Sequence, residues 1–193
     1  MNKNRVIEIL QETNALLNGH FLLSSGLHSN AYVQCAKLLR FPDKAAEVLS
    51  VAVEQVRELK IDKVCGPAMG GVIVSYEIGR QLWKESIFTE RKDGKMELRR
   101  GFSVKPGDRI LITEDVVTTG KSTMETAQIL TDMGAEIVGV ACIADRRADD
   151  CDFPLPVYSC VKLHIDTYRP DDCPLCKENK LPVEKPGSRE MKK

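Results

Sequence analysis

The sequence has no excess of charge of either sign, because its 193 residues hold 28 lysines and arginines against 28 aspartates and glutamates. A balanced chain lacks the positive field that drives non-specific binding to nucleic acids, so we expect no nucleic-acid partner. Also absent is any run of about 18 to 20 apolar residues, the length that spans a bilayer, and the first residues lack the apolar core of a signal peptide. We therefore expect a cytoplasmic protein without a membrane partner.

Two common nucleotide-binding signatures are missing as well. The chain contains neither the GxxxxGK[ST] pattern of a P-loop nor the GxGxxG pattern of a Rossmann fold. Its seven cysteines are an odd number and do not follow a disulfide framework. Most of the scattered cysteines have apolar neighbours, and we interpret five of them as buried reduced thiols: Cys35, Cys65, Cys142, Cys151 and Cys160.

What the chain does have is an ordinary globular composition, 42% hydrophobic and 29% charged, in a length that fits one domain over residues 1–193. The spacing of apolar residues predicts helices over residues 3–17 and 42–60, the second with Asp43 as its N-cap. A third helix is predicted over residues 123–133, where Ser122 and Glu125 have the spacing of a capping box.

Short apolar runs predict strands at residues 63–65, 110–113 and 137–144. The last run is continuous, as is typical of a parallel strand covered on both faces by helices. Asp93-Gly94 predicts a charged hairpin between residues 87–91 and 96–102, since both turn positions tolerate positive φ. These elements favour an α/β fold whose core covers about residues 36–145. We expect a smaller hood from about 1–35 and 146–170, and an irregular tail over 171–193.

One segment combines the features that a phosphate site needs. An apolar strand ends in Glu114 and Asp115, and residues 118–122, rich in hydroxyl groups, open a helix. Backbone N–H groups at a helix start lack internal partners and bind an anion without a basic side chain, and Gly120 permits a close approach. Two carboxylates nearby suit the vicinal hydroxyls of a sugar, directly or through a metal. The alternative is a plain N-cap loop beside two solvated carboxylates.

This segment, EDVVTTGKS at 114–122, resembles the phosphoribosyl diphosphate (PRPP) motif of the type I phosphoribosyltransferases. The rest of the chain is similar to the orotate phosphoribosyltransferase family over nearly its whole length, so the resemblance implies the type I fold, with a central, mostly parallel sheet flanked by helices and a small hood. The segments that carry the likeness are FLLSSGLHSNAYVQC at 21–35, GPAMGG at 66–71, ERKDGKMELRRGF at 90–102, IADRR at 143–147, and DCPLCK and EKPGSR in the tail.

The resemblance implies three groups of PRPP-binding residues. The motif would hold the 5-phosphate and the ribose hydroxyls, the loop after the first core strand would hold diphosphate, and a mobile hairpin would close over it. The residues implied are Glu114, Asp115, Val116, Val117, Thr118, Thr119, Gly120, Lys121 and Ser122, then Ala68, Met69, Gly70 and Gly71, then Arg91, Lys92 and Lys95. Arg91, Lys95 and Asp115 would be catalytic, with Lys95 as the proton donor to diphosphate.

Each of these assignments has a structural alternative. Residues 68–71 also fit an ordinary strand-to-helix turn, and the hairpin also fits a solvated charged surface. The sequence departs from much of the orotate family here, because no histidine lies in residues 90–102. This departure leaves the choice of the loop cation open.

The base pocket is implied by residues near both ends of the core. Arg146 matches the family position whose planar guanidinium pairs with the carboxylate of orotate, although Arg147 is its neighbour. Thr118 is a second implied orotate contact, and Ser25 and Gly26 belong to a segment that covers the base. In that segment His28 is open between a structural role and a ligand contact, whereas we interpret His20 and His164 as structural.

Cys173 and Cys176 form the chain's one CxxC pattern, which is half of a zinc site or a redox pair. A second CxxC or an HxxxH pair is missing, and His164 and Cys160 would complete four ligands only if the fold happened to bring them there. We therefore interpret Cys173 and Cys176 as reduced thiols.

The implied reaction joins ribose 5-phosphate from PRPP to orotate in pyrimidine biosynthesis, with Mg²⁺ as the cofactor. Magnesium would be bound mainly through PRPP, with Asp115 as the candidate protein ligand. The resemblance also implies a homodimer in which the mobile hairpin lies near the neighbouring site. The alternatives are a phosphoribosyltransferase for another purine or pyrimidine base and a PRPP-sensing regulator on the same scaffold.

Overall fold

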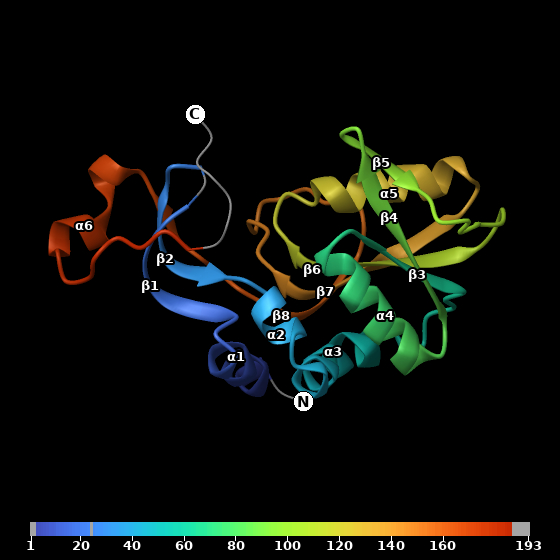
Figure 1. Cartoon of the computed structure of the whole chain (residues 1–193), viewed down its shortest axis with the longest axis horizontal. Coiled ribbons are helices and arrows are strands. Elements are labelled where there is room, and N and C mark those ends of the chain that lie inside the picture. The colour runs from blue at the N-terminus through green and yellow to red at the C-terminus, as the bar shows by residue number, and fades with distance from the viewer. Residues whose placement is uncertain (1–2, 24, 187–193) are drawn as a thin grey trace.

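The apolar runs of the sequence form a six-stranded sheet in the order β5-β4-β3-β6-β7-β8 (Figure 1). The structure, a computed structural model, describes residues 3–23 and 25–186. All neighbours in this sheet are parallel except β5, which forms an antiparallel hairpin with β4. The strands are β3 (Lys63–Pro67), β4 (Glu85–Lys92), β5 (Lys95–Leu98), β6 (Arg109–Val117), β7 (Glu136–Asp145) and β8 (Val157–Lys162).

Helices cover both faces of this sheet, which confirms the α/β expectation. α3 (Pro42–Val56) and α4 (Gly70–Leu82) pack on one face, and α5 (Lys121–Asp132) packs on the other (Figure 1). The two-residue period of a strand divides the apolar side chains between the two cores. Along β6, Leu111 packs with the α3 and α4 side, whereas Ile110 and Ile112 pack with the α5 side, and all three are fully buried. We call this sheet with its helices the body.

A smaller sheet at one side of the body forms the hood (Figure 1). Its antiparallel strands have the order β1-β2-β9, with β1 (Leu16–Leu22), β2 (His28–Val33) and β9 (Thr167–Tyr168). The tail extends it through a 3₁₀ turn (Pro170–Asp172), α6 (Pro174–Glu178) and a bridge between Phe21 and Glu184. From here on, the hood means β1, β2, β9 and residues 170–184, and the short α2 (Ala36–Leu39) follows β2 toward the body.

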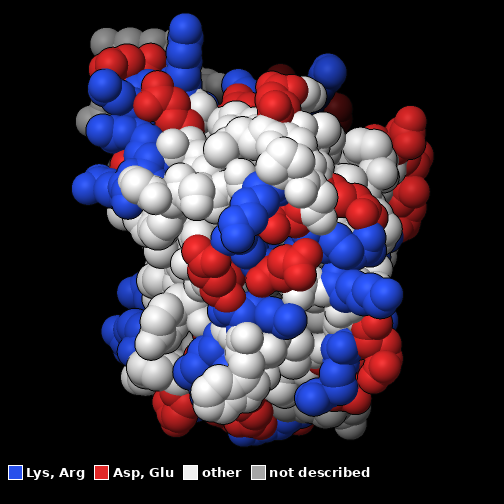
Figure 2. Space-filling model, turned by 90° about the vertical axis from the view of Figure 1, so that its right-hand side faces the viewer, with Lys and Arg blue, Asp and Glu red and all other residues white. Residues whose placement is uncertain are grey.

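The side of the body that faces away from the hood carries charges of both signs. Figure 2 shows basic and acidic side chains interspersed on this face, with uncharged side chains between them. No helix among residues 3–23 and 25–186 is both long enough and apolar enough to cross a bilayer.

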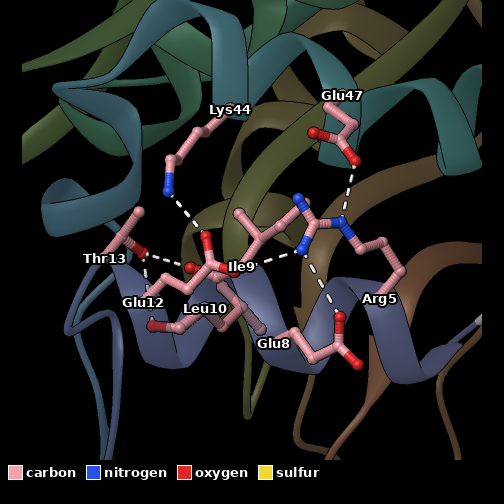
Figure 3. Close-up of polar contacts among 8 residues, drawn as sticks. All are labelled: Arg5, Glu8, Ile9, Leu10, Glu12, Thr13, Lys44 and Glu47. Atoms are coloured by element: carbon pink, nitrogen blue, oxygen red, sulfur yellow. Dashed lines mark hydrogen bonds and ion pairs between the residues drawn. The ribbon is translucent and has the colours of Figure 1, made fainter.

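α1 (Lys3–Glu12) is tied to α3 by a surface network of charges (Figure 3). Arg5 Nε donates to Glu47 at 3.1 Å, and Lys44 Nζ donates to Glu12 at 2.6 Å. Exposed pairs of this kind contribute little to stability, because solvent screens the two charges. Beneath the network Val6, Ile9 and Leu10 are fully buried, so apolar packing is the main reason why α1 stays on the body.

Several expected boundaries are wrong. The first helix ends at Glu12 rather than at residue 17, because Asn14 adopts a positive φ of 56° and the chain then enters β1. Pro42 begins α3, so its N-cap is Phe41 and Asp43 lies in the first turn. Gly120 is the N-cap of α5, which places Ser122 inside the helix and excludes the capping box expected for Ser122 and Glu125.

The expected division of the chain also needs correction. Residues 157–162 form β8 and pair with β7 in the main sheet, so the body extends beyond residue 145 and the segment 146–170 is not entirely hood. Cys151 is exposed, contrary to our expectation, because it lies in the irregular connection before β8. The other four scattered cysteines are buried and carry free thiols, as expected.

Candidate functional site

The candidate site lies where the carboxyl ends of β3 and β6 meet. The chain passes from β3 to β4 on one side and later returns to β6 on the other side of β3, so strand order reverses between β3 and β6. Ligands of open α/β sheets bind at such a switch point. The connection after β3 holds Ala68 and Met69, and the connection after β6 holds Thr118 and Thr119, so the fold brings two of the expected PRPP segments together.

Close backbone packing joins these two segments. A Cβ placed on Gly70 would lie 2.4 Å from Asp115 Oδ2, so glycine is needed for the carboxylate of Asp115 to lie against the start of α4. Thr113 Oγ1 donates to the carbonyl of Gly71 at 3.2 Å, and this bond also holds β6 against the start of α4. Ala68 and Met69 are exposed beside it, and the peptide bond between them is cis.

The loop before α5 presents backbone N–H groups at a helix N-terminus. The first helical bond runs from the N–H of Met124 to the carbonyl of Gly120 at 2.8 Å, and the main-chain N–H groups of residues 119–123 have no hydrogen-bond partner among residues 3–23 and 25–186. Gly120 has a φ of +69°, and a Cβ there would lie 2.3 Å from the ring of Phe153. Thr118, Thr119 and Lys121 are exposed, so this end of the helix is open to an anion.

The paired carboxylates lie inside β6 rather than after it. Burial, followed by the neighbouring charge of Asp115, raises the pKa of Glu114 from 4.5 to about 8. Within the described chain neither Glu114 nor Asp115 forms an ion pair. The Glu114 side chain accepts the main-chain N–H of Asp115, the Asp115 side chain accepts that of Val116, and a hydrogen bond between the two side chains also raises the pKa of Glu114. Two acidic groups of this kind favour a ligand that brings hydroxyl donors or a cation.

The structure distinguishes Arg146 from Arg147 at the end of β7. Arg147 forms two hydrogen bonds with Asp145, at 3.0 and 2.9 Å, and its guanidinium stacks over the ring of Phe153 at 4.9 Å. Arg146 Nε is buried and has no hydrogen-bond partner among the described residues. Burial lowers the pKa of Arg146 from its usual value. Of the two arginines, Arg146 is therefore the one whose buried N–H would gain a partner from an anionic ligand.

Arg146 lies next to the phosphate loop. The main-chain N–H of Arg146 donates to the carbonyl of Val117 at 2.8 Å, and Val117 directly precedes Thr118 in the chain. Cys35, at the start of α2, completes this corner with its thiol 3.7 Å from the carbonyl of Asp115. Burial and the charge of Asp115 raise the pKa of Cys35, so this thiol is neutral. We did not anticipate Cys35 here, because an isolated cysteine has no sequence pattern to place it.

The expected hairpin is present as β4 and β5, and both turn residues have positive φ, 51° at Asp93 and 81° at Gly94. Arg91 forms an ion pair with Glu125 of α5 and donates to the carbonyl of Gly94 at 3.0 Å. Lys92 and Lys95 are exposed. The hairpin thus contacts α5 through β5 and through the ion pair of Arg91 with Glu125.

Ser25 and Gly26 lie in the turn between β1 and β2, on the hood side of the molecule (Figure 1). Gly26 has a φ of +84°, and Ser25 is exposed. Gly26 N–H donates to the carbonyl of Leu23 at 2.9 Å, which closes the turn, and no hydrogen bond among the described residues joins Ser25 or Gly26 to Arg146 or Thr118, so their contact with the base stays a prediction. Residues 187–189 of the EKPGSR segment lie outside the described residues.

The largest departure from the sequence analysis concerns the histidines and the CxxC pattern. His20 of β1 and His28 of β2 meet Cys173 and Cys176, and the four ligand atoms lie within 4.8 Å of one another. His164 is exposed and Cys160 is buried elsewhere, so the alternative ligand set does not form. The sequence signal for the cysteines was the CxxC pattern, which we interpreted as reduced thiols, whereas nothing in the sequence showed that His20 and His28, on either side of the β1–β2 turn, would meet it.

Comparisons with known proteins agree with this geometry. The model of the phosphoribosyl transferase domain family matches residues 36–175. The orotate phosphoribosyltransferase of Caldicellulosiruptor bescii is 48% identical over 189 residues, which cover 98% of this chain and 99% of that protein.

Solved structures share the fold at lower identity. The chain is similar to orotate phosphoribosyltransferase from Aeropyrum pernix, with a TM-score of 0.71, 23% identity, and coverage of 82% of this chain and 93% of that one. An adenine phosphoribosyltransferase from Rhodothermus marinus gives a TM-score of 0.64 at 19% identity, with coverage of 83% and 99%. Enzymes for two different bases therefore share this backbone, so fold likeness by itself does not identify the base.

Proposed function

The chain belongs to the phosphoribosyltransferase family, and from this premise we propose the reaction and the residues that perform it. The protein is an orotate phosphoribosyltransferase: it transfers ribose 5-phosphate from PRPP to a ring nitrogen of orotate, giving orotidine 5-monophosphate and diphosphate. The substrates are small molecules, and the step forms a pyrimidine nucleotide. The near full-length likeness to a curated orotate enzyme supports this assignment.

The observation that carries the choice of base is Arg146. Its buried Nε has no partner among the described residues, and it adjoins the loop that binds the phosphate. An anionic base supplies the missing acceptor, whereas a neutral base would leave this N–H unpaired at a cost of about 1–3 kcal/mol or more. Orotate carries a carboxylate and satisfies the site, which uracil, adenine and hypoxanthine do not.

The body holds PRPP through three sets of groups. The free N–H groups and hydroxyls of residues 118–122 bind the 5-phosphate, and the carboxylates of Glu114 and Asp115 accept hydrogen bonds from the ribose hydroxyls. The main chain of residues 68–71 faces the diphosphate. Breaking of the carbon–oxygen bond runs ahead of nitrogen attack through an oxocarbenium-like state, so catalysis depends on positioning and on stabilising charge as diphosphate leaves.

The hairpin of β4 and β5 closes over the leaving group in this proposal. Arg91 must leave Glu125 to reach diphosphate, and Lys92 and Lys95 follow at the tip. Lys95 donates a proton to the departing diphosphate, so Lys95→Ala should lower kcat by about 100-fold, the usual size of a general-acid effect, with a smaller change in KM. Lys105→Ala is the matched control, because Lys105 lies in an exposed turn of the body away from the hairpin tip. Equal rates for the two variants would contradict the assignment.

Magnesium is the cofactor that we propose. Glu114 and Asp115 fit a cation-bound substrate, because these half-buried carboxylates have no basic partner in the described part of the chain and the pKa of Glu114 is raised to about 8. When bound, magnesium neutralises negative charge on the diphosphate. Asp115 is the candidate protein ligand, and most of the coordination comes from the substrate.

We propose that the protein acts as a cytoplasmic homodimer. Ile73, Tyr76 and Trp83 form an exposed apolar stripe along α4, with Tyr76 67% and Trp83 92% exposed. Such a stripe is typical of a contact between subunits. Trp83→Arg should therefore convert a dimer into a monomer in light scattering, and an unchanged mass would place the contact elsewhere. The buried free thiols of the body are consistent with a reducing compartment.

The direct test is an absorbance assay that follows orotate in the presence of PRPP and magnesium, beside uracil, adenine and hypoxanthine. We expect turnover of orotate alone. Turnover of another base without orotate would keep the PRPP site and overturn the role of Arg146. Binding of PRPP without turnover of any base would favour a PRPP-sensing regulator instead.

A further inference from the structure

Four side chains that the proposed reaction does not use converge in the hood. His20 and Cys173 are almost completely buried, His28 is 8% exposed, and only Cys176 reaches the surface. They come from β1, from β2 and from the residues around the start of α6, which lie 153 positions from His20 along the chain. Local sequence cannot create such a group, because only the packing of the tail on the hairpin brings these side chains together.

We propose that His20, His28, Cys173 and Cys176 bind one zinc ion that fastens the tail to the hood. Two thiolates and two imidazoles in a compact group are the ligand set that favours tetrahedral zinc over magnesium or calcium, which prefer oxygen. Four protein ligands leave no open position, so the ion is structural rather than catalytic.

Three distances between sulfur and nitrogen ligand atoms are close to those of a tetrahedron around a zinc ion. Zn–S bonds of about 2.3 Å and Zn–N bonds of about 2.0–2.1 Å place sulfur and nitrogen ligands about 3.5 Å apart. His20 Nε2 lies 3.6 Å from Cys173 Sγ and 3.7 Å from Cys176 Sγ, and His28 Nδ1 lies 3.3 Å from Cys176 Sγ. The two nitrogens are closer, at 2.8 Å, and must separate by about 0.5 Å to reach the tetrahedral edge.

The second nitrogen of His20 has the partner that a metal-bound histidine usually has. His20 Nδ1 lies 3.3 Å from the carbonyl oxygen of Leu181, which can only accept a hydrogen bond. A proton on Nδ1 would be donated to this carbonyl, and the lone pair of Nε2 would then be directed into the cluster. A backbone carbonyl that orients the ring from behind is a common feature of zinc sites.

A hydrogen-bonded group without metal explains these contacts less well. The one lone pair of His20 Nε2 faces three neighbours, namely His28 Nδ1 and both sulfur atoms, and it accepts one proper hydrogen bond. A central cation instead uses one lone pair from each of the four groups. The two sulfurs belong to a CxxC pattern, the usual spacing for two ligands of one zinc ion.

The hood is a part of the fold that a metal ion would stabilise. It is a small sheet with few fully buried apolar side chains, and small units of this kind are commonly stabilised by a metal or a disulfide. Apart from the cluster, the tail is attached to β1 by main-chain bonds between Leu22 and Glu184 and between Glu184 and His20, each 2.8 Å long. The zinc ion would therefore set the position of the tail and of the turn that holds Ser25 and Gly26.

Metal content is the direct test, and it does not depend on activity. The full chain would be purified under reducing conditions without a histidine tag, supplied with zinc, desalted, and analysed by plasma mass spectrometry. We expect about one zinc per chain. The variant is Cys176→Ser, because Cys176 is the exposed ligand and its loss disturbs packing least. The matched control is Cys151→Ser, which removes another exposed thiol outside the cluster.

Cys176→Ser should hold less than about a tenth of the zinc found in the control, because a three-ligand site with an open position binds far more weakly. Cobalt(II) supplied alone should give the visible bands of a tetrahedral thiolate site in the control and not in Cys176→Ser, with circular dichroism confirming that both are folded. The proposal is overturned if the reduced wild-type chain retains no zinc, if both variants retain it equally, or if Cys173 and Cys176 form a disulfide.

Discussion

The body and the hood are held together by different kinds of force. The body buries apolar side chains on both faces of a six-stranded sheet, among them the fully buried Leu111 and Ile112. The hood has three short strands and a tail, and its most compact feature is a polar group of two histidines and two cysteines. Hydrophobic burial therefore stabilises the body on both faces of its sheet, whereas the hood contributes Leu16, Ala31 and Val33 to one of these cores and adds a polar group beside them.

The two regions also divide the proposed chemistry. In the proposed reaction, the body positions PRPP through backbone groups and carboxylates at the ends of buried strands. The hood carries the turn expected to cover the base. The charged donor and the base are therefore assigned to different parts of the fold. Damage to each region should therefore give a different kinetic signature.

The largest effect is expected for Asp115→Asn in the body. The substitution keeps the size of the side chain and removes a charge that faces the ribose, so kcat should fall by about 100- to 1,000-fold. Circular dichroism should stay unchanged, because Asp115 has no ion pair in the described chain. Asp132→Asn, at the exposed end of α5, is the control. Near-wild-type turnover by Asp115→Asn would exclude Asp115 from the site.

Arg146→Gln tests the proposed contact between the arginine at the end of β7 and the base. Loss of a charged hydrogen bond to the base should raise the KM for orotate by about 10- to 100-fold, equivalent to about 1.5–3 kcal/mol. The KM for PRPP should change little. Arg147→Gln is the comparison, since Arg147 is already paired with Asp145 and should affect stability more than orotate binding. Equal increases in KM for both variants would mean that the two arginines share the base.

Removal of the proposed hood metal should produce a smaller and selective change. A zinc chelator acting on the wild-type chain should raise the KM for orotate a few-fold by loosening the turn with Ser25 and Gly26. The KM for PRPP should be unaffected, because the donor loop belongs to the body. Steady-state assays with magnesium restored after chelation would separate the two metals. An equal rise in both KM values would show that the hood and the body do not act separately.

The smallest expected effect concerns stability and comes from Glu114→Gln. The pKa of Glu114 is raised from 4.5 to about 8, so between these values the native state binds more protons than the unfolded state. The contribution of Glu114 to the free energy of unfolding of the wild type is therefore fully present below about pH 4.5. This contribution is lost as the pH rises toward 8. Glutamine does not titrate, so the variant should melt higher than wild type at pH 8.

The size of this shift follows from the length of the chain. Each kcal/mol corresponds to about 2–4 °C for a domain of this length, so a gain of at least about 2–4 °C is expected at pH 8. Little difference is expected at pH 4. Calorimetry of both proteins without PRPP or magnesium measures the difference in melting temperature. A difference that does not depend on pH would contradict the raised pKa of Glu114.

The sequence predicted the body far better than the hood. The continuous run in β7, the hairpin at Asp93 and Gly94, and the loop from Thr118 to Ser122 are each encoded by residues that are adjacent in the chain, so local patterns were sufficient. β8 was missed because its apolar residues follow an irregular connection and its partner β7 comes from a different segment. The ends of helices shifted wherever a proline or a residue with positive φ decided the boundary.

By itself the sequence determined the α/β class, the loop of residues 118–122 with two carboxylates before it, and the likeness to phosphoribosyltransferases, because each depends on short contiguous motifs. Only the tertiary structure decided that Arg146 and not Arg147 has a buried unpaired N–H, since that depends on the contact between Arg147 and Asp145. It also decided that His20 and His28 meet Cys173 and Cys176. Such groups arise from packing between segments about 150 residues apart in the chain, and a pattern of neighbouring residues cannot predict such a contact.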